Sequence, residues 1–246
     1  MLTDNEKKYF IDEAYLLFRD RCVEVKQYMS FVSLIGDSGY DHLAAVNGGV
    51  ATVGILQPLI KIDRDLEKTL RSSGLLLLYN LVEATMSNAI DAIHKVIKEE
   101  GVSYYGLSDN LQKITANHFK RAVNSDINNV FDENDHPISM AMVYIGYDKE
   151  GLFSGNIDCR EIKKAAKKYG FHSPRPDSEN RIISQVLFNI KDKRNALAHG
   201  RNSFLECGQD IAPDALPLMA HHTIVYLRAI LWSVSHYIRT GGYKKL

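Results

Sequence analysis

The residues best suited to chemistry lie in one stretch near the C-terminal end of the chain, Asn189–Gly200. This stretch contains Arg194, Asn195 and His199. Histidine transfers protons at neutral pH because its usual pKa is about 6.5, and arginine is always charged and can hold two phosphate oxygens. RNA supplies its own nucleophile, a 2′-hydroxyl that attacks the adjacent phosphate. The pair therefore fits cleavage of RNA, with Arg194 stabilising the phosphorane and His199 moving protons.

The spacing around Arg194 predicts a helix and places the arginine where an apolar residue is expected. A guanidinium buried there without a partner is expensive, so Arg194 must meet a carboxylate, an oxygen-rich ligand or a second chain. His199 lies about 140° from Arg194 around an ideal helix. We expect Gly200 to end the helix, which lets the imidazole be re-aimed, and Asn195 to orient it or bind a phosphate oxygen. The stripe consists of Ile183, Leu187, Ile190, Arg194 and Leu197.

Two further helices are strongly indicated. Thr3 and Glu6 form a capping box that opens a helix over roughly Asp4–Met29. A longer apolar stripe predicts a helix over Leu75–Ile97, ended by Gly101. Glu83 lies beside this stripe and is a candidate to hold Arg194 or the imidazole, or to be a purely structural partner for a basic residue. The stripe consists of Leu75, Leu78, Val82, Met86, Ala89, Ile93 and Val96.

The remaining elements complete an all-α, single-domain helical bundle over residues 1–246, in which a small β element is possible. We expect helices over Asp109–Val130 and Asp158–Tyr169, the second stopped by Gly170 and preceded by turn and capping residues Asn156, Asp158 and Arg160. Met140–Tyr147 is a candidate strand, and the glycine-rich segment Phe31–Ile60 is expected to be a loop or flap insertion. The last helix begins after Pro213 and carries an inward stripe of Leu218, His222, Val225, Leu227, Leu231, Val234 and Ile238.

Positive charge gathers around the Arg/His pair although the whole chain has a formal net charge of zero. Residues 156–201 contain eleven basic and five acidic side chains, a balance of +6. Such a local patch is what a phosphodiester substrate needs, although a solvated helix face is an equally good account of the lysines at 163–168. The candidate RNA-binding residues are Lys191, Lys193, Arg201, Lys164, Lys167 and Lys168.

Several other classes of protein are disfavoured. Cys22, Cys159 and Cys207 stand far apart, which indicates free thiols in a reducing compartment. The N-terminus lacks the apolar core of a signal peptide, and the most apolar stretch is broken by glycines and a proline, so we expect a cytoplasmic protein without membrane spans. No phosphate-binding loop, dinucleotide fingerprint or metal-ligand spacing is present, and the adjacent His221 and His222 point apart on a helix. We expect no metal and no cofactor.

Four blocks in order resemble the HEPN superfamily, and within it the MAE-type HEPN-like nucleases of bacterial defence and toxin islands. The first 70 residues carry no such resemblance, and the blocks cover about two thirds of the chain. The resemblance implies a metal-independent ribonuclease whose site is shared across a homodimer interface. The blocks are Leu76–Glu83, Ser154–Arg160, the Arg-x4-His motif at Arg194–His199, and Ala198–Gly208.

Three functions remain open at this point. The first is an endoribonuclease acting as a toxin or phage-defence effector, with an RNA substrate and a possible antitoxin or defence-system partner. The second is a catalytically silent HEPN module that binds RNA, nucleotide or a partner protein. A DNA-directed restriction accessory is the third. We also expect a symmetric homodimer with the Arg194–His199 helix and the Leu75–Ile97 helix at or near the two-fold axis.

Overall fold

The computed structural model describes residues 2–37, 42–44, 59–125, 142, 143, 153, 155–174, 178–212 and 214–245. Within these residues the chain is almost entirely helical, so the expected all-α bundle with a small β element is confirmed. The elements are α1 (Asp4–Asp37), β1 (His42–Ala44), β2 (Leu59–Lys61), α2 (Arg64–Glu99), the 3-10 turn η1 (Tyr104–Gly106), α3 (Asp109–Ser125), α5 (Cys159–Tyr169), α6 (Ser178–Ala198), α7 (Phe204–Gln209) and α8 (Ala215–Arg239).

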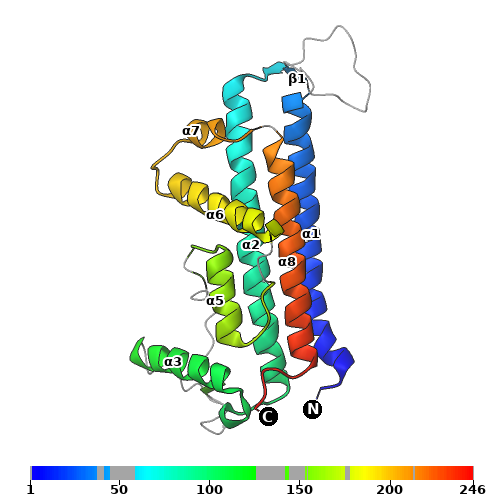
Figure 1. The fold of residues 1–246 in the computed structure, drawn as a ribbon, viewed down its shortest axis with the longest axis vertical. Coiled ribbons are helices and arrows are strands. Elements are labelled where there is room, and N and C mark those ends of the chain that lie inside the picture. The colour runs from blue at the N-terminus through cyan, green and yellow to red at the C-terminus, as the bar shows by residue number, and fades with distance from the viewer. Residues whose placement is uncertain are drawn as a thin grey trace.

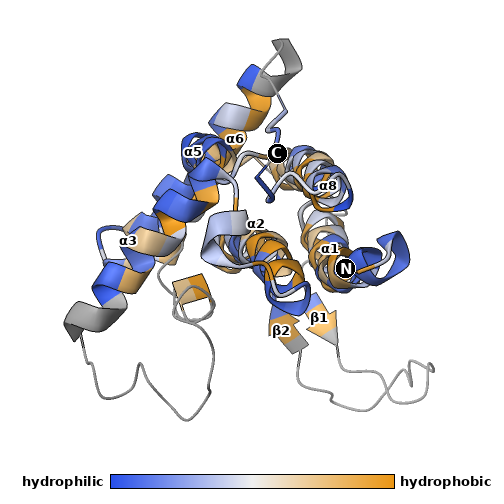
Figure 2. Ribbon diagram, turned by 90° about the horizontal axis from the view of Figure 1, so that it is seen from below, coloured by the Kyte–Doolittle hydropathy of each residue, from blue (hydrophilic) through white to orange (hydrophobic). Residues whose placement is uncertain are grey.

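Three long helices form the frame of the molecule. Helices α1, α2 and α8 run side by side, and the shorter α6 crosses over α2 towards α8 (Figure 1). Seen along the bundle, the hydrophobic sides of the three long helices face one another (Figure 2). Both chain ends lie at the same end of the bundle (Figure 1). This frame leaves α6 on the outside of the bundle, with its last turn free to carry a site.

Helix α2 is the centre of the core because it has neighbours on several sides. All seven residues of its predicted apolar stripe are at most 1% exposed. Leu81, Ile90 and Ile97, which lie off that stripe, are also buried, since α1 and α8 cover one side of α2 and α6 and α7 another. The helix begins with Asp63, whose side chain caps Leu66 N, and the chain leaves it through Gly101 in the left-handed conformation.

Helix α1 confirms its predicted start and corrects its predicted end. The Thr3 hydroxyl accepts from Glu6 N at 3.3 Å and the Glu6 carboxylate accepts from Thr3 N at 2.8 Å, as in a capping box. The expected loop over Phe31–Ile60 is wrong for its first seven residues, because the helix continues to Asp37. Val32 and Ile35 are buried, and this burial outweighs the unfavourable helix propensity of Gly36.

Among the described residues, the only β-strands are the antiparallel pair β1 and β2, beside an isolated bridge between Leu107 and Lys244. His42 pairs with Lys61, Leu43 with Ile60 and Ala44 with Leu59. The residues that join the two strands lie outside the described ranges, as does most of the candidate strand Met140–Tyr147. Residues 142 and 143 are described and helical, so the strand prediction is wrong at these two positions.

Helix α8 begins and ends near the predicted positions, but two members of its expected inward stripe face solvent. Leu218 is 55% exposed and Val225 is 45% exposed. Leu227 and Leu231 of the expected stripe are buried as predicted, and Leu216, Ala220 and Ile224, which the stripe did not include, are buried as well. Two adjacent stripes of apolar residues on α8 both fit helical spacing, so the sequence alone does not show which is buried. Contact with α1 determines it.

Candidate active site

The C-terminal end of α6 presents Arg194 and His199. Gly200 has a positive φ of 63°, and the backbone hydrogen bonds Gly200 N to Leu197 O and Arg201 N to Ala196 O close a Schellman motif. The prediction that Gly200 ends the helix is therefore confirmed. His199 occupies the cap position of this motif and is exposed. Among the described residues, its imidazole makes no hydrogen bond.

Arg194 is half-buried and held by uncharged groups. Its Nη1 donates to the carbonyl oxygen of Gly155 at 3.1 Å and to Oδ1 of the neighbouring Asn195 at 3.1 Å. Its guanidinium carbon lies 4.6 Å from the centre of the Tyr79 ring, a cation–π contact. No carboxylate of the described chain forms an ion pair with it. The guanidinium is thus fixed in place by groups that carry no negative charge.

Gly155 makes this close approach possible. Its φ of 72° lies in the left-handed region that favours glycine. A Cβ built at this position would stand 3.1 Å from Nη1 and 3.4 Å from Nη2 of Arg194. Both the backbone conformation and the space beside the guanidinium therefore favour glycine.

Asn195 and Asn156 extend the site beyond the guanidinium. The Asn195 side chain accepts from Arg194 through Oδ1 and donates through Nδ2 to Asn156 Oδ1 at 2.6 Å. This arrangement joins the end of α6 to the segment before α5. Asn195 therefore orients Arg194 within the chain, and no hydrogen bond between Asn195 and the His199 imidazole is present among the described residues.

Glu83 lies near the site without pairing with Arg194. Burial raises the pKa of the Tyr79 hydroxyl, the Glu83 carboxylate raises it further, and the Arg194 charge lowers it. The charges of Glu83 on α2 and Arg194 on α6 therefore both act on the Tyr79 hydroxyl. The described part of the chain shows no hydrogen bond or ion pair from Glu83 to Arg194 or His199, and the direct partners of Arg194 are Tyr79, Gly155 and Asn195.

One helical turn before Arg194, the cation Lys191 forms an ion pair with a carboxylate. Lys191 Nζ pairs with Asp158 Oδ2 at 3.1 Å, and Arg160 pairs with the same oxygen at 3.1 Å. Asp158 also caps α5 by accepting from Arg160 N and Glu161 N, as the sequence predicts. Burial opposes ionisation of this carboxyl, but the hydrogen bonds from Lys191, Arg160 and two backbone amides lower its pKa overall. Lys191 therefore links α6 to the N-terminal cap of α5.

Two of the other candidate RNA-binding residues form ion pairs, and the remaining three form none with the residues that the structure describes. Lys193 pairs with Asp210, and Lys164 pairs with Glu161 at 2.7 Å on an exposed surface. Arg201 is exposed beside His199. Lys167 and Lys168 line a pocket of about 420 Å³ between α3 and α5. Its lining comprises Asn110, Lys113, Ile114, Asn117, Lys164, Lys167 and Lys168.

Sequence reasoning identified the charged members of the site and missed two that hold Arg194. Tyr79 directly follows a stripe residue and Gly155 lies in a turn, and both belong to blocks that carry the family resemblance. Together with Asn195, the Tyr79 ring and the Gly155 carbonyl form the Arg194 cage. Neither of these two groups is charged, so neither segment shows a charge pattern from which the cage could be predicted. Among the described residues, no group of three His, Cys, Asp or Glu side chains is placed to hold a metal ion. In the same part of the chain, none of the helices has the length and hydrophobicity needed to cross a membrane.

Comparison with known proteins assigns the family. Among curated proteins and among solved structures, no significant match to this chain was found. The sequence profile of the family described as "HEPN_MAE_28990:/-like HEPN" matches residues 17–243. The match covers nearly the whole chain and includes α2, α6 and the segment that holds Arg194. The chain therefore belongs to the MAE_28990-like HEPN family.

Proposed function

We propose that this protein is an endoribonuclease that cleaves RNA by attack of the 2′-hydroxyl on the adjacent phosphate, and that it acts as a toxin or phage-defence effector. The observation that carries the proposal is the cage around Arg194. A structural arginine at a half-buried position pairs with a carboxylate, as Lys191 does one turn earlier. Arg194 is instead held by a carbonyl, an amide and an aromatic ring. HEPN domains are commonly ribonucleases, which supports the same reading.

In the proposed reaction, the 2′-oxygen forms a bond to phosphorus while the bond to the 5′-oxygen breaks. A base accepts the 2′-hydroxyl proton and an acid protonates the departing 5′-oxygen. His199 is assigned to proton transfer because its imidazole is exposed at the end of α6, where a substrate can reach it. Arg194 stabilises the negative charge that develops on the phosphorane. The products are a 2′,3′-cyclic phosphate and a 5′-hydroxyl, and no metal takes part.

The direct test is cleavage of an end-labelled RNA by the purified chain, with and without EDTA. We expect cleavage in both, cyclic phosphate products, and loss of activity in Arg194→Ala and His199→Ala. Matched controls are Arg181→Ala, an exposed arginine on the same helix, and His172→Ala, an exposed histidine. Full loss of activity in EDTA, or 3′-hydroxyl products, would contradict the mechanism. A DNA strand of the same sequence, which lacks the 2′-hydroxyl, should not be cleaved.

The cellular role is tested by induced expression. We expect wild-type protein to stop growth and the Arg194→Ala and His199→Ala variants to be tolerated, while the Arg181→Ala and His172→Ala controls remain toxic. Equal tolerance of all five proteins would argue against a toxin. An antitoxin or a defence-system protein encoded nearby is the partner that this role requires.

We further propose that the site is completed by a second copy of the chain. Each chain offers one Arg194 and one His199, whereas the reaction needs both an acid and a base. Two His199 side chains across a two-fold axis near the end of α6 provide both. Because α2 is largely buried within its own chain, its contribution to such an axis is limited to its half-exposed face near Asn80 and Glu83. Sedimentation gives the stoichiometry, and adding excess His199→Ala chains should inhibit the wild type, because a mixed dimer has only one His199.

The basic cavity between α3 and α5 is the proposed contact for the RNA backbone. Four lysines converge there, and Lys168 has its pKa lowered by burial and by the charge of Arg121. An RNA phosphate would relieve this crowding. We expect a Lys167→Ala/Lys168→Ala double variant to weaken RNA binding and to reduce the salt dependence of binding by about 0.7 per lost phosphate contact. The Arg181→Ala variant is the control.

A catalytically silent binding module is the second candidate. The observation that favours it is that His199 makes no hydrogen bond with Arg194 or any other described residue, so one chain alone shows no assembled catalytic pair. This candidate predicts that wild type and His199→Ala bind RNA equally and that neither cleaves it.

A further inference from the structure

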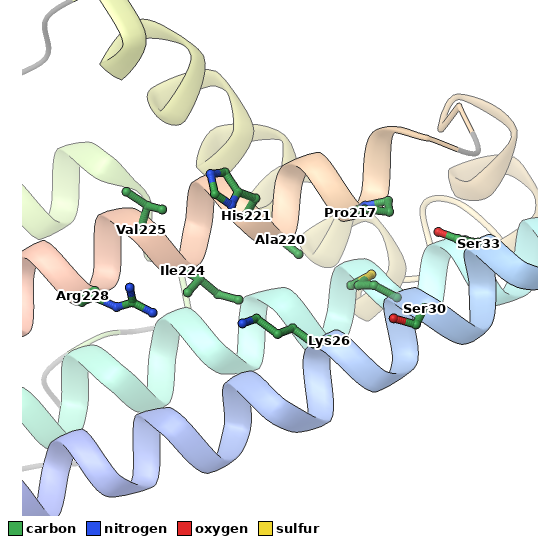
Figure 3. A pocket seen from close by; sticks show the side chains of 10 residues that line it. Lys26, Ser30, Ser33, Pro217, Ala220, His221, Ile224, Val225 and Arg228 are labelled. Atoms are coloured by element: carbon green, nitrogen blue, oxygen red, sulfur yellow. The ribbon is translucent and has the colours of Figure 1, made fainter.

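A groove between α1 and α8 lies apart from the Arg194 site. It has a volume of about 510 Å³, which is ample for several side chains. Its floor is apolar and buried and is formed by Met29, Ala220 and Ile224. Its rim carries the exposed cations Lys26 and Arg228 (Figure 3). The groove thus combines an apolar floor with a positive rim.

Lys26 and Arg228, the two cations of the rim, lie at the same end of the groove. Their charged ends point towards each other from opposite helices (Figure 3). Burial raises the pKa of the Cys22 thiol to about 11, and the charges of Lys26 and Arg228 both act to lower it. The thiol therefore lies within reach of both charges. Neither cation forms an ion pair with a carboxylate in the described ranges, so this end of the groove carries two uncompensated positive charges.

Exposed apolar side chains extend the groove along both walls. Val23 on α1 is 49% exposed, one turn before Lys26. On α8, Val225 is 45% exposed and Trp232 is 69% exposed, one turn on either side of Arg228. Residues three and four apart share a helix face, so these side chains border the charged end. Burying such residues would contribute binding energy that the free chain leaves unused.

We infer that this groove docks an amphipathic helix of a partner protein, with at least one acidic side chain placed between Lys26 and Arg228. Two antiparallel helices leave a trough into which a third helix packs through apolar residues at spacings of three, four and seven. An aspartate or glutamate can meet both cations at once, and an apolar residue one turn away covers Met29 and Ile224. Trp232 is the type of large aromatic anchor that dominates such interfaces.

A second copy of this chain is a poorer occupant. A two-fold axis through the groove would place Lys26 and Arg228 opposite their own copies, and like charges brought together oppose association. Charge complementarity therefore favours a different protein with acidic residues. This inference does not depend on RNA cleavage, because the groove shares no residue with the Arg194 cage.

The test is selection of helical peptides from a displayed library against the full chain, followed by affinity measurement on purified peptides. We expect enriched sequences with Asp or Glu flanked by apolar residues at helical spacing. A Lys26→Glu/Arg228→Glu variant should weaken their binding by about tenfold or more. Replacing the peptide's acidic residue by Lys should restore binding to that variant, an exchange that a misfolded variant could not show. Lys120→Glu, a charge reversal at an exposed site on α3, is the control.

Other outcomes would overturn the inference. Failure to enrich any peptide over the charge-reversed variant, or enrichment of neutral or basic sequences, would show that the groove is not an acidic-helix site. Concentration-dependent dimerisation abolished by Arg228→Glu would assign the surface to a second copy. Competition by a short single-stranded RNA that also depends on Lys26 and Arg228 would assign it to nucleic acid. Thermal melting of each variant establishes that these exposed substitutions leave the fold intact.

Discussion

Two cations one turn apart on α6 meet the same neighbouring segment in opposite ways. Lys191 reaches Asp158, in an ion pair whose side chains are 15% and 5% exposed. Arg194 reaches the carbonyl of Gly155 and the ring of Tyr79, with no carboxylate partner in the described chain. The first arrangement pairs a cation with a carboxylate at the start of a neighbouring helix. The second immobilises a cation without a carboxylate partner, at a cost in stability that a bound anion would offset.

The largest expected effect is a loss of activity on replacing Arg194, which we compare with a loss of stability on replacing Lys191. Arg194→Ala should lower kcat/KM for RNA by about 10³-fold, or about 4 kcal/mol of transition-state stabilisation, while the free energy of unfolding changes little. Lys191→Ala should do the reverse, keeping most of the activity and losing roughly 2 kcal/mol of stability because Asp158 is left buried beside Arg160 alone. RNA cleavage rates and urea unfolding of both variants measure this. If Lys191→Ala lost as much activity as Arg194→Ala, the distinction would fail.

The second prediction concerns the carboxylate that compensates Lys191. Asp158→Ala should lower the free energy of unfolding by roughly 3 kcal/mol, because it removes the cap of α5 and leaves Lys191 without its partner. Urea unfolding at neutral pH measures the loss. Glu161→Ala on the same helix is the control, since its pair with Lys164 is exposed and should change stability by no more than about 0.5 kcal/mol.

Acid should remove the same contribution from the wild type. The pKa of Asp158 is lower in the folded chain than its usual value, so its contribution is present above about pH 4 and is lost as the pH falls further. The gap in stability between wild type and Asp158→Ala should therefore narrow in acid. A gap that stays constant down to pH values where both proteins still fold would show that the charge of Asp158 is not what stabilises α5 and α6.

The third prediction tests the backbone that holds Arg194. Gly155→Ala should lower stability by about 1 kcal/mol through its positive φ and lower activity by about tenfold, because the added Cβ meets the guanidinium and moves it. Gly241→Ala is a matched control. Its φ of 68° imposes the same strain, but the nearest atom to its Cβ is a Lys244 carbon at 3.9 Å, away from the site. Equal activity of both variants would mean that the position of Arg194 does not depend on Gly155.

The features that could be predicted from the sequence are those that depend only on residues close to one another along the chain. The cap at Thr3, the end of α6 at Gly200 and the buried stripe of α2 depend on residues within one or two turns, and all three are present. Arg194 was expected to need a partner, because the apolar spacing places it towards the core. Its half-buried position agrees with that spacing.

The partner itself was beyond the reach of local patterns. Gly155 lies 39 residues from Arg194, and its place beside the guanidinium is set by how α5 packs on α6. Tyr79 reads as an ordinary core aromatic until α6 crosses α2. The same limit explains the exposed Val225, because only the docking of α1 decides which of two adjacent apolar stripes on α8 is buried. The acidic residue favoured by the sequence, Glu83, is near the site, but the described part of the chain shows no hydrogen bond or ion pair between it and Arg194.

The smallest expected effects come from two substitutions of Tyr79, which distinguish the role of its ring from that of its hydroxyl. The hydroxyl oxygen accepts a long hydrogen bond of 3.3 Å from Ile157 N, whereas the ring face lies against Arg194. Tyr79→Phe keeps the face, so activity should stay within about threefold of wild type, and stability should fall by about 1 kcal/mol because a buried amide loses its acceptor. Tyr79→Leu removes the face as well and should lower activity by about tenfold more, since a cation–π contact at a half-buried site contributes about 1 kcal/mol and also fixes the guanidinium plane. Cleavage rates and urea unfolding of the two variants decide between these roles. If Tyr79→Phe and Tyr79→Leu lost equal activity, the ring would not hold Arg194, and the Gly155 carbonyl and Asn195 amide would be its only functional support.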